Sequence, residues 1–325
     1  LWYLRMIVAP STHALGLYHD DIAASRGLLD PAITLPALLG VIALLGVGFA
    51  ALRRAPLIGF GILWFFTGQL MESTVFPLLI AQEQRNYLAD YGILLALLYA
   101  VFRLAARTDL RVFLRGAVAA FLALLFATTL TRAWHWRNPV DQALYAVHHH
   151  PRSADNAYML GRVFADAALQ GHLKNPAPAF AALERAARFD QSIAPESALI
   201  VLSAGLHRPV DPAWPASMTR KISATPLSAS ALYALKSLVM CLQSDCRLPS
   251  RTVSRVFDAA FHAPNLARMP GREATLLTVY GQYELNVRRD FVSGGRLFRR
   301  AVTVAPGVAQ YRINLINLLL VMGKV

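Results

Sequence analysis

Long apolar runs in the first 136 residues constrain this chain more than any other feature. A helix needs ~20 mainly apolar residues to cross the ~30 Å hydrocarbon core of a bilayer, and three runs reach or approach that length. They cover residues 32–52, 91–106 and 112–134. A fourth run at 56–71 is shorter but carries no charge, and residues 1–10 have the composition of the end of another. The pattern predicts four spans plus the tail of a fifth.

The apolar excess is confined to one part of the chain. Hydrophobic residues make up 56% of the 325 residues, against about 45–50% in a typical soluble protein, and the excess lies in residues 1–136. Residues 137–325 have the mixed composition of a soluble domain. We therefore expect an all-α protein with a transmembrane region over 1–136 and a separate helical domain over 137–325. Both ends of the sequence fall inside apolar or helical patterns, so we expect a piece of a longer protein.

Arginines mark one side of the expected membrane region. They fill two short connections between spans, and cytoplasmic connections are the ones that carry an excess of Lys and Arg. These residues are Arg53, Arg54, Arg103, Arg107 and Arg111. Residues 11–31 and everything after Trp136 then lie on the opposite side. That side is the periplasm if the protein belongs to a bacterial inner membrane, which is our expectation, and a lumen if the source is not bacterial.

The formal net charge of +13 raises nucleic acid and anionic membrane surfaces as partners. The arginines occur in scattered pairs such as Arg299–Arg300 rather than in a continuous basic stripe. Several of them flank expected spans, where membrane topology accounts for them. We therefore expect membrane lipid as a partner and no binding of nucleic acid.

Two cysteines, Cys241 and Cys246, fall on the non-cytoplasmic side in this topology. An oxidising compartment permits a disulfide between them, and free thiols are the alternative. A zinc site would need two further ligands, and no His or Cys neighbours the pair in sequence. The three adjacent histidines His148, His149 and His150 cannot converge on one ion from a helix. They are expected to end a helix before Pro151.

Residues 137–325 contain patterns of small and aromatic residues that resemble the tetratricopeptide repeat, a helix pair of about 34 residues. The more specific copy has Gly294, Phe298, Ala301 and Pro306 at the positions of a second helix, and a looser copy includes Leu160, Gly161, Phe164, Ala179, Leu183 and Ala186. The resemblance implies an α-solenoid, which stacks its helix pairs and uses its concave side to bind a peptide or another protein.

Polar residues cluster in "ESTVFPLLIAQEQRNYL" (72–88), which connects two apolar runs on the expected non-cytoplasmic side. Common soluble catalytic motifs, such as a Gly-rich phosphate loop, HExxH or GxSxG, do not occur in the sequence. Together with "YLRMIVAPSTHALGLYHDD" and the repeats, the stretch resembles the C-terminal half of polytopic glycosyltransferases of the type-C superfamily. It is most similar to the transmembrane and tetratricopeptide-repeat-containing group and its bacterial relatives. The matching positions are Glu72, Ser73, Pro77, Glu83, Arg85, Tyr87 and Leu88, with Gln84 where the family has His.

The resemblance implies transfer of a sugar from a polyprenyl-phosphate donor to an acceptor, expected to be a protein, on the non-cytoplasmic face. Such chemistry needs a carboxylate as a base or to orient the acceptor, and a cation on the donor phosphate. The resemblance implies Glu72 and Glu83 as the carboxylates. It implies Arg85 and Arg5 as the cations that bind the donor phosphate, and His19, Asp20 and Tyr87 as residues of the pocket. The lipid-linked sugar is a substrate, no cofactor is implied, and no metal is indicated. The family's essential acidic residue lies in an earlier outer loop, so we expect this piece alone to be inactive.

Each of these residues also has a structural interpretation. Arg5 can extend its guanidinium to the membrane interface while its aliphatic stem stays in lipid. The charges of Glu72, Glu83 and Arg85 can pair with each other and fix the connection, and Asp20 with Asp21 can be simply solvated. At the level of the whole chain, the alternative to an enzyme is a membrane-anchored repeat scaffold, without chemistry, for envelope or secretion assembly.

Overall fold

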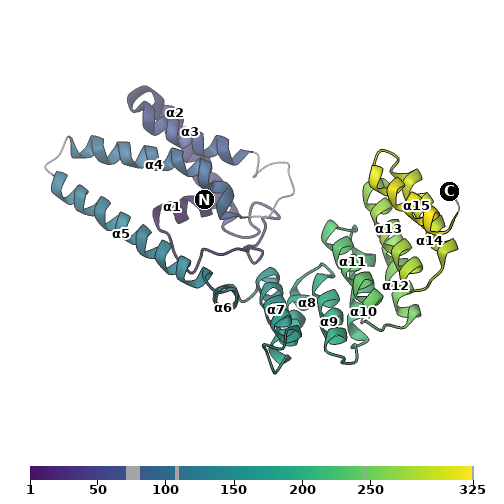
Figure 1. Ribbon diagram of the computed structural model, residues 1–325. Helices are drawn as coiled ribbons and strands as arrows, with labels where there is room; N and C mark the ends of the chain where they lie inside the picture. Colours follow the sequence, from purple (N-terminus) through teal and green to yellow (C-terminus); the bar gives the residue numbers. More distant parts are fainter. Residues whose placement is uncertain (71–80, 107–109, 245, 324–325) are drawn as a thin grey trace. The chain divides into compact units, whose positions relative to one another are not determined.

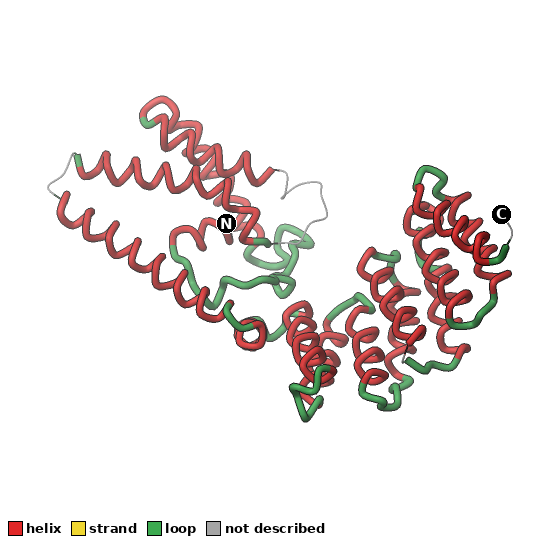
Figure 2. Tube along the Cα trace, in the orientation of Figure 1, coloured by secondary structure: helices red, strands yellow, loops and turns green. Residues whose placement is uncertain are grey.

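A computed structural model describes the chain except for residues 71–80, 107–109, 245 and 324–325. Within the described residues the regular structure is helical, with no strand (Figures 1 and 2). The chain forms two compact units, Leu1–Asn156 and Ala157–Val325. The first unit continues beyond Trp136, where we expected the boundary, because the end of α6 (Pro139–His149) and the start of α7 (Ala154–Leu169) contact the loop that follows α1 (Trp2–Val8).

The first unit contains three long apolar helices and three shorter ones, and the first turn of α7. The long helices are α2 (Thr34–Arg54), α4 (Glu83–Ala105) and α5 (Arg111–Trp136); the short ones are α1 (Trp2–Val8), α3 (Pro56–Leu70) and α6 (Pro139–His149). The long helices have the length and composition of membrane spans. Their outward faces carry exposed side chains such as Phe49, Phe113 and Phe126, which suit contact with lipid. The protein is therefore membrane-associated.

One of the expected spans has a different start in the structure. Helix α3 covers 15 described residues, close to the expected run at 56–71, and the residues that follow Leu70 lie outside the described part of the chain. Helix α4 begins at Glu83 and not near residue 91, so the second half of the polar stretch 72–88 is helical. An acidic residue in the first turn suits the positive end of a helix dipole. Apolar runs alone cannot mark such a start, because the first turn here is polar.

Glycines bring α2, α3 and α4 into close contact. A Cβ atom at Gly92 of α4 would lie 2.3 Å from the carbonyl oxygen of Gly61 in α3, and one at Gly59 would lie 2.6 Å from that of Gly48 in α2. Small residues let helix backbones approach in a membrane, where packing rather than the hydrophobic effect drives association. These three helices therefore form a tightly packed group within the first unit.

The second unit is a series of amphipathic helices joined by short connections (Figure 1). After α7 (Ala154–Leu169) they are α8 (Ala177–Phe189), α9 (Ala194–Gly205), α10 (Ala213–Ala224), α11 (Ala229–Ser244), α12 (Ser250–Phe261), the 3-10 helix η1 (Leu266–Arg268), α13 (Pro270–Asn286), α14 (Phe291–Val304) and α15 (Ala309–Val321). Helix α11 packs between α9 and α13, whereas α10 packs against α12. Helices that alternate along the chain thus lie in two rows.

The residues singled out as repeat positions are largely buried in this unit. Ala179, Leu183 and Ala186 on α8 have no exposed surface, and Phe298 and Ala301 lie in the core on α14. Cys241 at the end of α11 and Cys246 are joined in a disulfide. Buried residues drawn from each of the helices α9 to α13 form one apolar cluster.

Candidate functional site

Glu83 joins three parts of the first unit. Its Oε1 atom accepts a hydrogen bond from the backbone N–H of Gly16 (2.7 Å) and lies 3.3 Å from Nε2 of His19. Its Oε2 atom accepts a hydrogen bond from Nη1 of Arg132 (2.6 Å). The carboxylate therefore connects the loop after α1 and the end of α5 to the first residue of α4. We call Glu83, His19 and Arg132 the Glu83 cluster.

His19 is the most enclosed member of this cluster. Only 4% of its surface is exposed, and its ring lies between that of Trp2 (4.8 Å between centroids) and that of His150 (5.5 Å). With Nε2–H donating to Glu83, the other ring nitrogen, Nδ1, has a lone pair. Within the described residues Nδ1 is buried and has no hydrogen-bond partner. A carboxylate that accepts from Nε2–H holds the imidazole in the tautomer whose Nδ1 is an acceptor.

A second histidine–carboxylate pair lies beside the first. His150, at the end of α6, has its Nδ1 atom 3.0 Å from Oδ2 of Asp21, and among the described residues its Nε2 atom is buried without a partner. Gly16 lies beside both imidazoles: a Cβ atom there would lie 3.4 Å from His150 Nε2 and 3.6 Å from His19 Cε1, in ordinary van der Waals contact with each ring. The loop backbone thus packs against both histidines.

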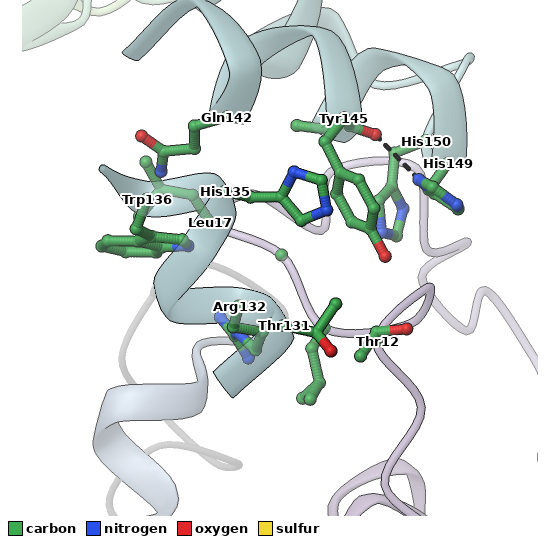
Figure 3. Close-up of a pocket in the computed structure, with 13 residues that line it drawn as sticks. Thr12, Leu17, Thr131, Arg132, His135, Trp136, Gln142, Tyr145, His149 and His150 are labelled. Carbon is green, nitrogen blue, oxygen red and sulfur yellow. Dashed lines mark hydrogen bonds between the residues drawn. The ribbon is translucent and has the colours of Figure 1, made fainter. Parts of the chain in front are cut away.

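A small cavity adjoins the cluster, between the end of α5 and α6 (Figure 3). Its volume of about 30 Å³ holds about one water molecule and no sugar. His135, Tyr145 and His149 stack along one wall, with centroids 4.2 and 4.1 Å apart, and Arg132 lies across from them. A guanidinium and imidazoles thus lie among the described residues that line this small cavity.

The Glu83 cluster lies at one end of α4, and arginines lie at the other. At the C-terminal end of α4, Nη1 of Arg103 donates to the carbonyl oxygen of Arg54 (2.8 Å). The 23 residues of α4 span about 35 Å at 1.5 Å per residue, roughly the thickness of a bilayer core. The arginines and the Glu83 cluster therefore lie at opposite ends of this helix.

The predicted site residues do not all come together. Asp20 does not enter the cavity: its carboxylate accepts hydrogen bonds from the hydroxyl of Ser153 and from the backbone N–H of Ala154 (2.7 Å) and Asp155 (3.3 Å), at the start of α7. A carboxylate that satisfies unpaired N–H groups at a helix start is a cap. In the structure Asp20 therefore caps α7, whereas the resemblance implied a place in the pocket.

The two arginines proposed for phosphate binding differ in position. Arg5 lies on α1 with its side chain exposed, and Arg85 lies on the first turn of α4, partly buried. A third arginine, Arg132, donates to the Glu83 carboxylate. Tyr87 is 67% exposed and its ring contacts that of Tyr91. Glu72, Ser73 and Pro77 lie outside the described residues.

Sequence reasoning missed Arg132 and a set of buried polar side chains in the membrane region. Gln69 of α3 donates a hydrogen bond to Asn86, and Asn86 donates to Asp90, both on α4. Gln69 and Asn86 are 8% and 4% exposed. Polar side chains within a span are unfavourable in lipid and mark functional or packing contacts. Their signal in the sequence was the interruption of apolar runs by Arg132 and Asp90.

Chemically, the arrangement offers a guanidinium, a carboxylate and two imidazoles at one end of two apolar helices. These groups suit binding of an oxyanion and acceptance of a proton. No group of three or more His, Cys, Asp or Glu side chains within the described residues is placed to hold a metal ion. No protein-family model and no curated protein matches the chain.

Proposed function

We propose that this chain is part of a membrane glycosyltransferase that moves a sugar from a polyprenyl-phosphate donor to an acceptor, a protein, on the non-cytoplasmic face. The observation that carries the proposal is the placement of Glu83 between Arg132 and His19 at the end of two spans. The sequence resemblance of residues 72–88 to type-C enzymes points to the same stretch.

In this proposal each member of the cluster has a role in one transfer step. The acceptor oxygen forms a bond to the anomeric carbon of the sugar, the bond from that carbon to the phosphate oxygen breaks, and polyprenyl phosphate leaves with the bonding electrons. Arg132 stabilises the growing charge on the phosphate. His19 Nδ1 takes the acceptor proton, and Glu83 holds the imidazole in the required tautomer.

The helices of residues 137–325 complete the proposal as a tetratricopeptide-like solenoid that binds the acceptor or a partner protein. Support comes from the two rows of packed helices and from the burial of the repeat positions. On the positive-inside argument this domain lies in the periplasm of a bacterium whose inner membrane holds the spans.

A membrane-anchored scaffold is the second candidate, and one observation favours it. Both oxygens of Glu83 already have partners within the chain, as expected of a contact that only holds the loop, α4 and α5 together. The two functions differ in whether the cluster must exchange a proton and contact a phosphate.

The experiment is a transfer assay in proteoliposomes that contain the full-length enzyme of which this chain is proposed to be part, together with a radiolabelled polyprenyl-phosphate sugar. We expect release of polyprenyl phosphate with wild type and a loss of at least about tenfold with His19→Asn, since a general base contributes about 10²–10⁴ in rate. His148→Asn, on the same face of the membrane, is the matched control. Equal transfer by both variants would remove His19 from the reaction, and the absence of transfer by every protein would favour the scaffold.

A further inference from the structure

A second cavity lies in the other unit, between α10, α12 and the segment that follows the disulfide. Its volume of about 380 Å³ is in the range of small-ligand pockets. Arg247 and Arg255 line it together with Thr219 and Thr252, and Val210 and Pro215 are among its apolar lining residues. None of its described lining residues is acidic. This arrangement combines two cations with an apolar surface.

Local structure explains why the two arginines reach the same cavity. Cys246 is buried, is bonded to Cys241, and donates its backbone N–H to the carbonyl oxygen of Cys241 (2.9 Å), which fixes the residue directly before Arg247. On α12, Val253, Val256 and Phe257 are buried in the core. Arg255 and Thr252, three positions apart, share the remaining face. The disulfide and the core of α12 therefore set the positions of both cations.

The guanidiniums of Arg247 and Arg255 are available to a ligand. Both residues are exposed, and over the described part of the chain neither forms an ion pair or a side-chain hydrogen bond. The hydroxyl of Thr219 already donates to the carbonyl oxygen of Pro215 (3.0 Å). The donors that face a ligand are thus the two guanidiniums and the hydroxyl of Thr252.

We propose that this cavity binds an acidic side chain or the C-terminal carboxylate of a partner protein's peptide segment. Guanidinium forks bind carboxylates in a bidentate manner, and Arg clusters recognise acidic motifs. The second unit contains twice as many Lys and Arg as Asp and Glu, which attracts an acidic partner. A cavity accommodates one side chain, whereas a membrane presents its phosphates on a broad plane, so the geometry favours a peptide.

This inference names the partner site of the solenoid and in that respect rests on the proposed function. The two are measured separately, because peptide binding needs no sugar transfer. Absence of peptide binding with sugar transfer intact would contradict only the inference about the cavity. Peptide binding without sugar transfer would contradict only the proposed enzymatic function.

The test measures binding of a short fluorescent peptide of alternating glutamate and leucine to the full chain in detergent, by polarisation. Arg247→Ala combined with Arg255→Ala is expected to weaken binding at least about tenfold, the equivalent of about one charge-assisted hydrogen bond. Arg251→Ala combined with Arg268→Ala removes the same charge from exposed positions that do not line the cavity. This control is expected to bind nearly as well as wild type.

Three results would overturn the inference. They are an equal loss in the control, equal binding of the matching glutamine and leucine peptide, and binding of phosphatidylglycerol vesicles through Arg247 and Arg255 without binding of the peptide. All four arginines are exposed, so their replacement leaves the apolar core intact, and circular dichroism of each variant checks the fold.

Discussion

Replacing Glu83 by alanine tests whether the cluster holds the first unit together. The change removes three hydrogen bonds to a carboxylate whose side chain is 21% exposed. Such bonds to a charged group contribute about 1.5–3 kcal/mol each. Because the His19 contact is long (3.3 Å) and the Glu83 side chain is partly exposed, we expect the three bonds together to contribute about 3–5 kcal/mol to the free energy of unfolding. At about 2–4 °C per kcal/mol, Tm falls by about 6–20 °C.

The assay is a double-mutant cycle by thermal unfolding in detergent. Glu83→Ala, Arg132→Ala and the double variant are compared with wild type, and Gln84→Ala is the control because Gln84 is exposed on the same turn. Because Oε2 of Glu83 and Nη1 of Arg132 are 2.6 Å apart, the sum of the two single losses should exceed the loss in the double variant by about 1.5–3 kcal/mol. Additive losses would show that Glu83 and Arg132 are not paired and would refute the reasoning.

Three further predictions concern packing, capping and pH. Gly92→Val should lower Tm in detergent far more than Gly46→Val. A Cβ atom at Gly92 would lie 2.3 Å from a carbonyl oxygen of α3, whereas one at Gly46 would have no neighbour within 4 Å. Similar Tm values for the two variants would refute the close contact. Asp20→Ala should cost about 1 kcal/mol of stability by leaving two N–H groups of α7 uncapped, which denaturant unfolding checks. Hydrogen bonds from backbone N–H groups at the start of α14 lower the pKa of Asp290 in the folded protein. The ionised side chain therefore stabilises the fold fully above its unfolded pKa of about 4, and this stabilisation is lost as pH falls through the lower folded pKa. Between these two pKa values, the Tm of Asp290→Asn should change less with pH than the Tm of wild type.

The spans of α2 and α5 could be predicted because uninterrupted apolar side chains over a bilayer's thickness allow few alternatives. The start of α4 could not, since its first turn is polar. Its helical conformation is stabilised by contacts with Gly16, His19 and Arg132, which are distant in sequence. The resemblance pointed to Glu83 as a site residue, and Glu83 lies at the centre of the cluster.

The partners of Glu83 could not be predicted from the sequence. Arg132 lies 49 positions away on α5, and pairing between distant residues has no local pattern. Asp20 illustrates the opposite error, because a short acidic loop has the same composition whether it binds a ligand or caps a helix. In the second unit, small residues such as Ala179 and Ala186 were informative, since close helix contacts restrict those positions to small side chains.

The side of the membrane on which Glu83 lies is the most direct test of the account, because a polyprenyl-linked donor used outside the cytoplasm must meet the cluster there. Leu29, in the loop that contacts Glu83, is 74% exposed, and Leu110, before α5, is 51% exposed. The native cysteines are bonded to each other, so a single new cysteine reports its own position. A membrane-impermeant maleimide applied outside intact cells should label Leu29→Cys and leave Leu110→Cys unlabelled until the membrane is opened. The reverse pattern would place the Glu83 cluster in the cytoplasm and contradict the proposed function.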